Sequence, residues 1–450
     1  MPRRPRVVIA GGGAAAIEAM IAMRELMDGF VGIDMVTPES AFVYRPLLVA
    51  EPFGLSERVS FDLGEIAADH AAELHVGPVE VVDPDEKVVK MEGGPVLPYD
   101  SLLVATGART EPWLDGAIHF GGPDQVNAMR ELVGELDEGQ LASVVFAAAP
   151  GSRWTLPLYE LALLTASRAG ERRSDLELTI VTPENEPLGE FGPSASAHIR
   201  ELCSDRGIRL HTATRASSWL HGRVQLSTGT ELEADRVVAL PDLAGNPIGG
   251  LPCDRDGFIP VDEYCAVRGI ADVFAAGDGI DYPIKQGGLA TQQADVAAAM
   301  IAAQLGEAIT PQPFRPLLRG QLLTGLAPVY MSASPEGGEP PGESLAPNPL
   351  WWPPSKIAGR YLAPYLANLI TPGGVTELEQ REPIVAARAE TREEARQLAL
   401  TFAEQDARHR HFDSAIGWLE VLEQLDGVLA PPLAKKRDEW RSLSGERGDG

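Results

Sequence analysis

The sequence has few cysteines, little positive charge and no long hydrophobic run. Its 450 residues include only three cysteines, Cys203, Cys253 and Cys265, which are too few for a disulfide framework and fit a reducing compartment. Lys and Arg total 38 against 65 Asp and Glu, so the net charge is −27 and a nucleic-acid partner is disfavoured. No apolar run reaches the roughly 18 residues that a membrane-spanning helix needs.

Several catalytic signatures are also missing. The sequence contains no C-x-x-C pair, no Gly-x-Ser-x-Gly elbow, no Walker loop and no spacing typical of a metal site. These absences disfavour dithiol, serine-hydrolase and P-loop chemistry. No cleavage site for a signal peptide follows the basic N-terminus, and the acidic balance disfavours attachment to an anionic bilayer. We therefore expect a cytoplasmic protein, with peripheral contact at the inner face of the membrane as the alternative.

Two segments have the pattern of a βαβ unit. Residues 6–39 read as strand, Gly-rich turn, helix and strand, and residues 143–184 repeat that order. Both units end in the tetrapeptide VTPE, at residues 36–39 and 181–184, which we interpret as an internal structural repeat. The length of 450 residues is also too great for one ordinary core. We predict an α/β protein with two Rossmann-like domains.

The first Gly-rich turn carries a dinucleotide-binding fingerprint. Gly11, Gly13 and Ala16 form a G-x-G-x-x-A motif between the strand and the helix. The first glycine permits the tight turn, the second lets a pyrophosphate approach the backbone, and the alanine lets the helix lie close to the sheet. The phosphates would lie at the partially positive end of the helix. Thr37 holds the register position of a ribose-binding residue, but Glu39 is our preferred candidate because a carboxylate accepts from both ribose hydroxyls.

Three further segments suit a flavin dinucleotide. The segment SLLVATGA is a buried strand that ends in Ala105, Thr106 and Gly107, where small residues allow a cofactor to pass closely. The segment DVFAAGDG ends a strand at Asp278, whose carboxylate is well placed to bond a ribityl hydroxyl. The segment GPVEVVD would put Val79 beside an adenine edge.

Taken in order, these segments resemble the pyridine nucleotide-disulfide oxidoreductase superfamily of flavoproteins over roughly residues 6–330. The resemblance implies bound FAD. It is strongest to the branch of sulfide:quinone oxidoreductases and type II NADH dehydrogenases, through FVYRPLL, which contains Arg45, and PIKQGGLATQQAD. In that branch the second segment begins a helix aimed at the flavin pyrimidine ring. Lys285, with the amides of Gln286 and Gly287, would stabilise the negative charge of a reduced flavin; the alternative is a solvated surface lysine.

The resemblance also predicts the domain organisation. Residues 1–115 and 250–330 would form a discontinuous FAD-binding domain, and residues 116–249 would form a second, NAD(P)-binding-like domain. Each would be a Rossmann-like domain with three ββα layers. Residues 331–450 would form a C-terminal, α-rich cap region with terminal helices.

The second βαβ unit lacks the glycines of its fingerprint. Its turn reads AAAPGSRWTLPLYE, in which Pro150, Trp154 and Pro157 would crowd a pyrophosphate. We interpret this fingerprint as degenerate, which disfavours conventional NAD(P)H binding. Glu160 matches the position of a glutamate that lies close to the flavin in the related branch, which implies a proton relay. The alternative is a carboxylate that the helix dipole stabilises.

The C-terminal region is rich in aromatic residues and helical sequence. Trp351 and Trp352 precede two prolines, and their rings suit either the lining of an acceptor site or plain packing. The last predicted helix, within the helical sequence of residues 391–429, has one apolar stripe, made of Ala415, Trp418, Leu419, Leu422 and Leu425. Its polar side is acidic, so we expect it to dock on its own chain or to form a homodimer contact.

We predict an FAD-dependent oxidoreductase that passes electrons from an unidentified small-molecule donor to a quinone or similar acceptor. One alternative is an NAD(P)H-dependent flavin reductase or dehydrogenase with atypical nucleotide binding. Another is a flavoprotein without turnover that serves as a redox sensor or interaction module. Gln292 and Gln293 resemble glutamines beside a quinone site in the related branch, although a plain amphipathic helix would explain them nearly as well.

Overall fold

The computed structural model describes residues 3–27, 29–172, 175–334, 344–347, 349–351, 353–370, 392–408, 412–426 and 429–445. Trp352 lies outside these residues. The chain forms two compact units, Met1–Pro364 and Tyr365–Gly450. In the described residues, no helix combines the length and the apolar character that crossing a bilayer requires.

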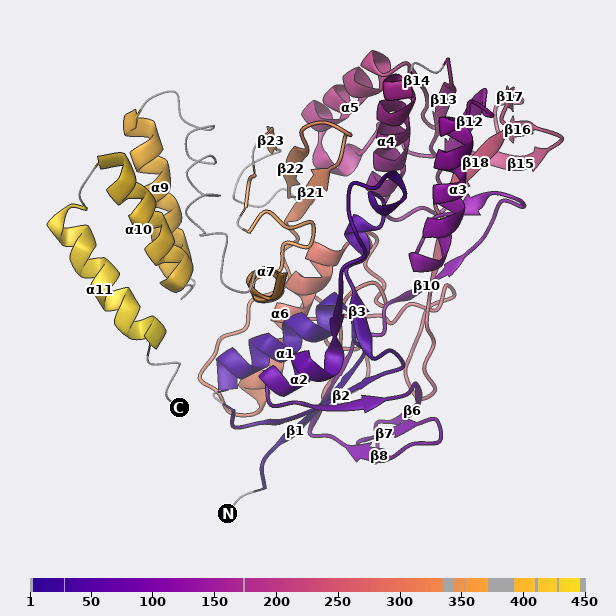
Figure 1. Ribbon diagram of the computed structural model, residues 1–450. Helices are drawn as coiled ribbons and strands as arrows, with labels where there is room; N and C mark the ends of the chain where they lie inside the picture. Colours follow the sequence, from indigo (N-terminus) through magenta and orange to yellow (C-terminus); the bar gives the residue numbers. More distant parts are fainter. Residues whose placement is uncertain are drawn as a thin grey trace. The chain divides into compact units, whose positions relative to one another are not determined.

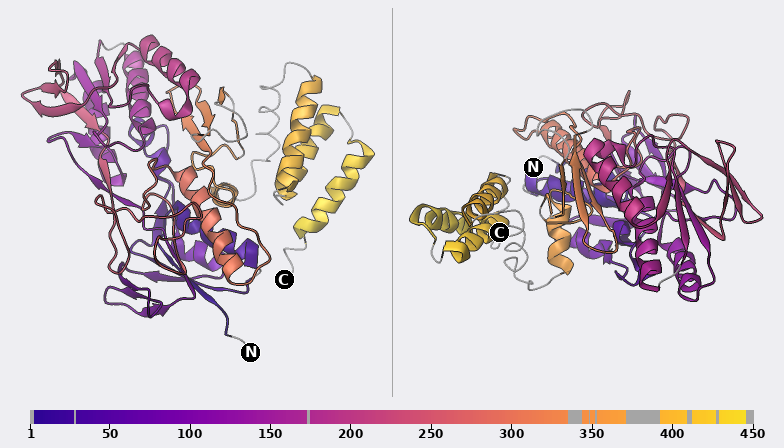
Figure 2. Two further views of the ribbon diagram at one scale, coloured as in Figure 1. Left: turned by 180° about the vertical axis from the view of Figure 1, so that it is seen from behind. Right: turned by 90° about the horizontal axis from the view of Figure 1, so that it is seen from above.

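The first sheet of the larger unit has five parallel strands (Figure 1). In spatial order they are β20 (Val273–Ala275), β9 (Ser101–Val104), β1 (Arg6–Ala10), β2 (Gly32–Thr37) and β5 (Glu73–Val76). β1 reads RVVIA and is almost wholly buried, as expected for a parallel strand covered on both faces. Helices α1 (Ala14–Met27) and α6 (Gly287–Gln304) pack side by side against this sheet (Figures 1 and 2), and α2 (Leu63–Asp69) packs near β5.

A second, antiparallel layer covers the other face of this sheet. It consists of β6 (Val79–Asp83), β7 (Val88–Met91) and β8 (Val96–Pro98). Val82 and Val89 from this layer share one hydrophobic core with Val8, Val36 and Leu102 of the parallel sheet. The result is the three-layer ββα arrangement.

The second fold repeats this plan. Its parallel sheet consists, in spatial order, of β11 (Ile118–His119), β18 (Arg236–Ala239), β12 (Ser143–Ala147), β13 (Glu177–Val181) and β14 (Ile208–His211). Its helices are α3 (Val126–Asp137), α4 (Leu156–Arg172) and α5 (Pro193–Asp205). Its antiparallel layer consists of β15 (Ala216–Leu220), β16 (Arg223–Leu226) and β17 (Glu231–Glu233). The two VTPE segments end corresponding strands, β2 and β13.

Smaller elements complete the larger unit. β10 (Ala108–Glu111) and β19 (Asp242–Gly245) form an antiparallel ribbon. β10 follows β9 of the first sheet, and β19 follows β18 of the second sheet. The remaining strands are β3 (Ala41–Val43), β4 (Ser60–Asp62), β21 (Leu318–Leu322), β22 (Val329–Ala333) and β23 (Ser344–Ala346). The 3-10 turns are η1 (Arg45–Leu47), η2 (Glu51–Phe53), η3 (Pro123–Gln125) and η4 (Gly189–Phe191). Helix α7 (Leu362–Ile370) starts at the end of this unit.

The smaller unit contains α9 (Arg392–Arg408), α10 (Phe412–Asp426) and α11 (Pro431–Gly445). Of the predicted apolar stripe, Ala415, Trp418, Leu419 and Leu422 are buried, and the side chain of Leu425 lies outside the described part. The rings of Phe402 and Trp418 pack with centroids 4.7 Å apart, which joins α9 to α10.

The predicted fold class is confirmed: the chain is an α/β protein with two Rossmann-like folds and a helical C-terminal region. β20 lies in the first sheet although the second fold separates it from β9 in the sequence, as a discontinuous first domain requires. The domain boundaries themselves stay a prediction.

Candidate functional site

The ends of β1 and β9 meet at the first fingerprint glycine. Gly11 has φ +134°, and a Cβ atom there would lie 2.1 Å from the carbonyl oxygen of Ala105. The Gly11 N–H donates to the carbonyl oxygen of Val36 at 2.7 Å. Only glycine satisfies both the backbone angle and this close approach. Gly11 therefore holds the fingerprint turn against the segment of Ala105, Thr106 and Gly107, which follows β9.

The second fingerprint glycine faces open space. A Cβ atom on Gly13 would meet no protein atom within 4 Å. Gly13 directly precedes α1, whose first N–H groups have no partner inside the helix and attract negative charge. Ala16 is fully buried, and its small side chain keeps α1 close to the sheet. This open, partially positive helix end suits a pyrophosphate.

The candidate ribose-binding residues lie at the end of β2. Thr37 is buried, and its Oγ1 atom accepts from the Glu39 N–H at 3.4 Å and lies 3.3 Å from Glu39 Oε2. Glu39 is exposed, and that long contact is the one hydrogen bond recorded for its carboxylate in the described residues. Glu39 therefore retains most of its capacity to accept hydrogen bonds from a ligand.

Gly107 and Asp278 lie at the ends of neighbouring strands. Gly107 has φ +68°, and a Cβ atom on Gly279, next to Asp278, would lie 3.1 Å from the Gly107 carbonyl oxygen. Asn246 Nδ2 lies 3.3 Å from each of the Thr106 and Gly107 carbonyl oxygens, which supports this turn. In the described part of the chain, the Asp278 carboxylate accepts no hydrogen bond. A half-buried carboxylate with no protein partner suits a ligand hydroxyl.

Two cations influence that carboxylate. Burial raises the pKa of Asp278, while Lys285 and Arg45 act in the opposite direction. Arg45 is exposed and belongs to η1, far from Asp278 in the sequence. Val79, the predicted adenine neighbour, is half-buried at an irregular position of β6. The structure thus places the charges of Arg45, Asp278 and Lys285 near one another, with Val79 on the antiparallel layer.

Lys285 is buried rather than solvated. Its side chain donates to the carbonyl oxygen of Ile280 and lies over the ring of Phe258, with Nζ 4.0 Å from the ring centroid. Burial lowers the pKa of Lys285 to about 8, against the attraction of Asp278. The alternative of a surface lysine is therefore wrong, and an ammonium group with this pKa can change its charge near neutral pH.

The start of α6 is capped by its own residues. Gln286 is the N-cap, and its Oε1 atom accepts from the Leu289 N–H at 2.8 Å. A Cβ atom on Gly287 would lie 3.0 Å from Ile357 Cγ1, so a later segment covers this helix end. Gln292 bonds to backbone groups of Leu317, and Gln293 accepts from the Gly277 N–H. These bonds support the interpretation that the two glutamines stabilise the packing of α6.

Glu160 takes part in a buried ion pair. Its Oε1 atom accepts from Lys356 Nζ at 2.5 Å and from the Leu323 N–H at 2.9 Å. Glu160 is 1% exposed and Lys356 is 8% exposed. Burial raises the pKa of Glu160 and lowers the pKa of Lys356, while each partner opposes the shift of the other. The two pKa values therefore move toward each other, which favours exchange of a proton.

Lys356 belongs to residues 355–362, which we call the strap. The hydroxyl of Tyr44 accepts from the Ile357 N–H at 2.9 Å, and burial raises the pKa of Tyr44 to about 12. Ile357 in turn packs against Gly287 at the start of α6. The strap thus connects both folds. Sequence reasoning missed Lys356 and Tyr44; the one signal for Lys356 was an isolated cation in the mainly apolar stretch after two prolines.

The glutamate of the VTPE segment in the second fold has different hydrogen-bond partners from Glu39. The Glu184 carboxylate accepts from Thr155 Oγ1 at 2.8 Å, Tyr159 Oη at 2.7 Å, Thr182 Oγ1 at 2.7 Å and the Leu188 N–H at 3.0 Å. Four donors nearly saturate a carboxylate. Glu184 is the counterpart of Glu39 in the repeat, yet it is held by its own fold. This arrangement disfavours ribose binding at that position.

A cavity of about 470 Å³ lies beside the β10–β19 ribbon. Its lining carries both signs of charge and one thiol, from Arg109, Glu111, Arg153, Asp242, Cys253 and Asp256. The three cysteines are free; burial raises the pKa of the Cys203 and Cys265 thiols to about 12, and Cys253 is exposed. The cavity mixes charges and therefore does not specify one class of ligand.

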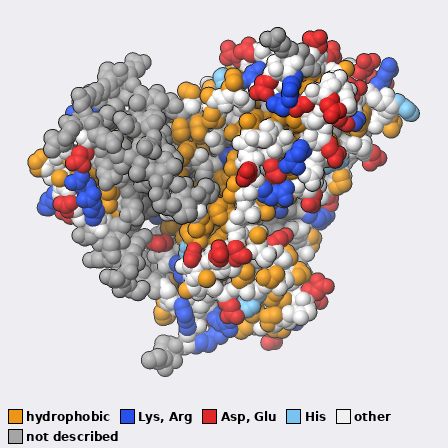
Figure 3. All heavy atoms as spheres, in the orientation of Figure 1, with side chains coloured by type: hydrophobic (Ala, Val, Ile, Leu, Met, Phe, Trp, Pro, Cys, Tyr) orange, Lys and Arg blue, Asp and Glu red, His pale blue; other side chains and the backbone are white. Residues whose placement is uncertain are grey.

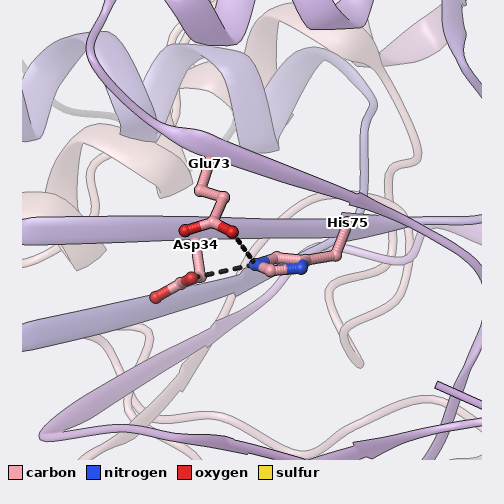
Figure 4. A group of neighbouring side chains, drawn as sticks. All are labelled: Asp34, Glu73 and His75. Carbon is pink, nitrogen blue, oxygen red and sulfur yellow. Dashed lines mark hydrogen bonds and ion pairs between the residues drawn. The ribbon is translucent and has the colours of Figure 1, made fainter. Parts of the chain in front are cut away.

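Asp34, Glu73 and His75 lie close together (Figure 4) and offer possible metal ligands. His75 Nε2 lies 2.9 Å from Asp34 Oδ1. The guanidinium group of Arg6, however, bonds the same carboxylate, with Nη2 2.9 Å from Asp34 Oδ2. Because Asp34 is already paired with a cation, we interpret the group as an ion-pair cluster that joins β1, β2 and β5.

The fold and the open turn define the class of this protein: a flavoprotein oxidoreductase with two dinucleotide-binding folds, the first of which has the cofactor cradle. Residues 5–300 match the pyridine nucleotide-disulphide oxidoreductase family, and the chain belongs to this family. Its members bind FAD, so the predicted cofactor and the oxidoreductase role are confirmed. The residues at Gly11, Gly13 and Asp278 fit the cofactor.

Relatives differ in their named partners. Rhodocoxin reductase of Rhodococcus erythropolis is 28% identical over 320 residues, which cover 66% of this chain and 71% of that protein. Sulfide-quinone reductase of Aquifex aeolicus is 26% identical over 285 residues, which cover 62% of each chain. The structure of the sulfide:quinone oxidoreductase from Aquifex aeolicus aligns with a TM-score of 0.69 at 19% identity, over 76% of this chain and 86% of that chain. This structural likeness supports the fold alone.

Two glycine substitutions separate cofactor binding from folding. We expect Gly13→Ala to lower FAD retention more than tenfold, because the new methyl group enters the open space, and to cost the apoprotein at most about 1 kcal/mol. We expect Gly11→Ala to destabilise even the apoprotein, by roughly 3 kcal/mol or more, because the backbone is strained and Ala105 is too close. Flavin absorbance per protein and the Tm of the apoproteins measure both effects. A Gly13→Ala protein that retains full flavin would contradict the fingerprint assignment.

Proposed function

We propose that this chain takes electrons from a donor other than NAD(P)H and passes them to a quinone-like acceptor. Bound FAD would supply the two-electron exchange. The buried pair of Glu160 and Lys356 carries the proposal, because reduction of a quinone consumes two protons as well as two electrons. The protein must then deliver protons to a place that excludes water.

The pair is suited to that delivery. Lys356 Nζ and Glu160 Oε1 are 2.5 Å apart and buried, so a proton can move between them without a large rearrangement. Leu323 N–H bonds the same oxygen at 2.9 Å and fixes the carboxylate in place. In this proposal the pair supplies one proton to the acceptor through Lys356, the group that faces it, and reduced FAD would supply the second proton together with the two electrons.

The surroundings of the pair suit an apolar acceptor. Leu323 immediately follows β21, and hydrophobic side chains gather over the region of β21–β23 on the face seen in Figure 3. Leu326 and Leu345 in this region are 75% and 37% exposed. Tyr330 and Trp351 pack edge to face, with centroids 5.5 Å apart. A quinone-like ring would find apolar and aromatic surface here.

The donor side argues against a nicotinamide dinucleotide. The turn after β12 contains Pro150 and Trp154, and Pro157 lies in the first turn of α4. The ring of Trp154 packs on Phe191 with centroids 5.8 Å apart. Glu184, the counterpart of Glu39 in the repeat, accepts four hydrogen bonds from its own fold, which leaves little capacity for a ribose. An NAD(P)H-dependent reductase is the alternative. Its support is the similarity to rhodocoxin reductase, which is named as a reductase.

The donor and the acceptor can be tested by visible absorbance of the purified flavoprotein without oxygen. We expect no bleaching by NADH or NADPH, because the second fold lacks the glycine fingerprint and Glu184 is already hydrogen-bonded within its own fold. We also expect none by sulfide, because two of the three thiols are buried with raised pKa values. Protein reduced with dithionite should regain its absorbance on addition of a soluble quinone. Rapid bleaching by a nicotinamide would overturn the donor proposal, and reduced protein that ignores quinones would favour a redox sensor.

The ion pair can be tested by comparing single and double variants. Lys356→Met leaves Glu160 buried without a cation, so we expect a loss of about 3–5 kcal/mol in the free energy of unfolding. Adding Glu160→Gln removes the charge and should recover most of this loss. Quinone reduction should stay at least tenfold below wild type in the double variant, because the pair no longer supplies its proton. Recovery of turnover together with stability would assign the pair to packing alone.

Lys285 can be tested through the midpoint potential of the flavin. Below its pKa of about 8 the lysine is protonated, and a nearby positive charge favours the reduced flavin. Lys285→Met should therefore lower the potential at pH 7 by roughly 30 mV, a tenfold change in the two-electron equilibrium. It should also remove the change of slope that we expect for the wild type near pH 8. Lys90→Met, at a half-buried lysine of β7 beside Asp83, is the control; equal effects of both variants would refute the assignment.

A further inference from the structure

A second buried carboxylate holds the far end of the strap. Glu18 lies on α1 and is fully buried. Its Oε1 atom accepts from the Tyr361 N–H at 2.9 Å, and its Oε2 atom accepts from the Leu362 N–H at 2.6 Å. A Cβ atom on Gly359 would lie 2.6 Å from Oε2, so the strap needs a glycine to wrap around this carboxylate. The contact lies where α7 starts.

Asp295 on α6 faces the same carboxylate. The two carboxyl groups are neighbours within hydrogen-bonding reach, and a hydrogen bond between them requires a proton on one of them. Asp295 Oδ1 is buried and has no hydrogen-bond partner in the described part of the chain. When two neighbouring carboxyl groups are shielded from water, the charge on one strongly opposes ionisation of the other. The pair therefore retains one proton near neutral pH.

The hydrogen bonds indicate which residue holds the proton. Glu18 accepts backbone N–H groups at the start of a helix, and both features favour its ionised form. Asp295 accepts no backbone N–H in the described residues. Asp295 is therefore the protonated donor and Glu18 is the charged acceptor.

Few other charges act on the pair. On the strap, Arg360 is exposed and lies over the Tyr361 ring at 5.0 Å, and its charge lowers the pKa of Asp295. On α1, Glu25 is exposed and, with the pair, raises the pKa of Tyr361. Burial is the largest cause of the pKa shifts of the pair itself. It raises the pKa of Glu18 to about 7 and raises the pKa of Asp295 well above its ordinary value.

We propose that Glu18 and Asp295 share one proton and that this pair positions the strap, and with it Lys356 against Glu160. The two are positioning residues, since they act through the strap rather than on reacting atoms. Their part in the reaction rests on the proposed function; their hold on the strap does not.

The proposal predicts that one of two similar substitutions opens the strap and that the other leaves it closed. Asp295→Asn keeps a neutral donor toward Glu18, so the strap should stay closed. Glu18→Gln replaces a charged acceptor by a neutral one, so exchange of the Tyr361 and Leu362 amides should rise about tenfold or more. Glu25→Gln removes an exposed carboxylate from the same helix and should change nothing. Hydrogen exchange of residues 355–364 in the FAD-loaded protein, read by mass spectrometry, measures all three.

The pH profile gives a readout that simple packing would not move. As the pH rises through the raised pKa of the pair, the wild type should lose its shared proton, and repulsion between two buried carboxylates should open the strap. The sign follows from the raised pKa: the folded state binds more protons than the unfolded chain, so stability falls as the pH rises through the folded value. Asp295→Asn has no proton to lose and should keep its protection throughout this range.

Each outcome decides the proposal. If Asp295→Asn opens the strap at neutral pH, or loses protection at alkaline pH as the wild type does, the shared proton is refuted. This variant carries the test even if Glu18→Gln does not fold. If Glu18→Gln folds and leaves exchange unchanged, the positioning role is refuted.

Quinone reduction separates this proposal from the proposed function. Opening of the strap in Glu18→Gln should lower quinone reduction while flavin content stays the same. If exchange responds as expected but quinone reduction does not fall, the pair still positions the strap, and the relay through Lys356 is wrong.

Discussion

The ion pair between Lys356 and Glu160 is the contact on which the rest of the site depends. Removing two charges from water costs several kcal/mol for each ion, so the pair persists only because the atoms are close and the Leu323 N–H completes the geometry. Ile357 directly follows the lysine and packs on Gly287. The ion pair therefore fixes the position of Lys356 and also places Ile357 over the N-terminal end of α6.

The parts of the site that could be predicted from sequence are those whose requirements are met within one turn. Gly11 and Gly13 are such residues, because a backbone angle and an open approach are local demands. The fold class could be predicted because each βαβ unit shows its own periodicity. Lys356 and Glu18 could not: their partners lie 196 and more than 340 positions away, and a single lysine or glutamate has no pattern.

The two VTPE segments show how far a repeated sequence determines a site. Both end the second strand of a parallel sheet, so the repeat correctly indicated two related folds. Glu39 is exposed and makes one long contact, whereas Glu184 accepts four hydrogen bonds from its own fold. The difference comes from neighbours that lie outside the tetrapeptide, Thr155 and Tyr159. The same four residues therefore end in an accessible carboxylate in one fold and in an internally hydrogen-bonded carboxylate in the other.

The hydrogen bonds of Glu184 also stabilise the start of α4. Glu184 bonds Thr155 and Tyr159 at the start of α4, and Glu160 is the next residue along the helix. The bonds that disfavour ribose binding thus also fix the first turn of α4, and that turn presents Glu160 to Lys356. A glycine-rich fingerprint would leave this helix end open to phosphate. In its place, the packed turn makes the helix a rigid support for a buried carboxylate.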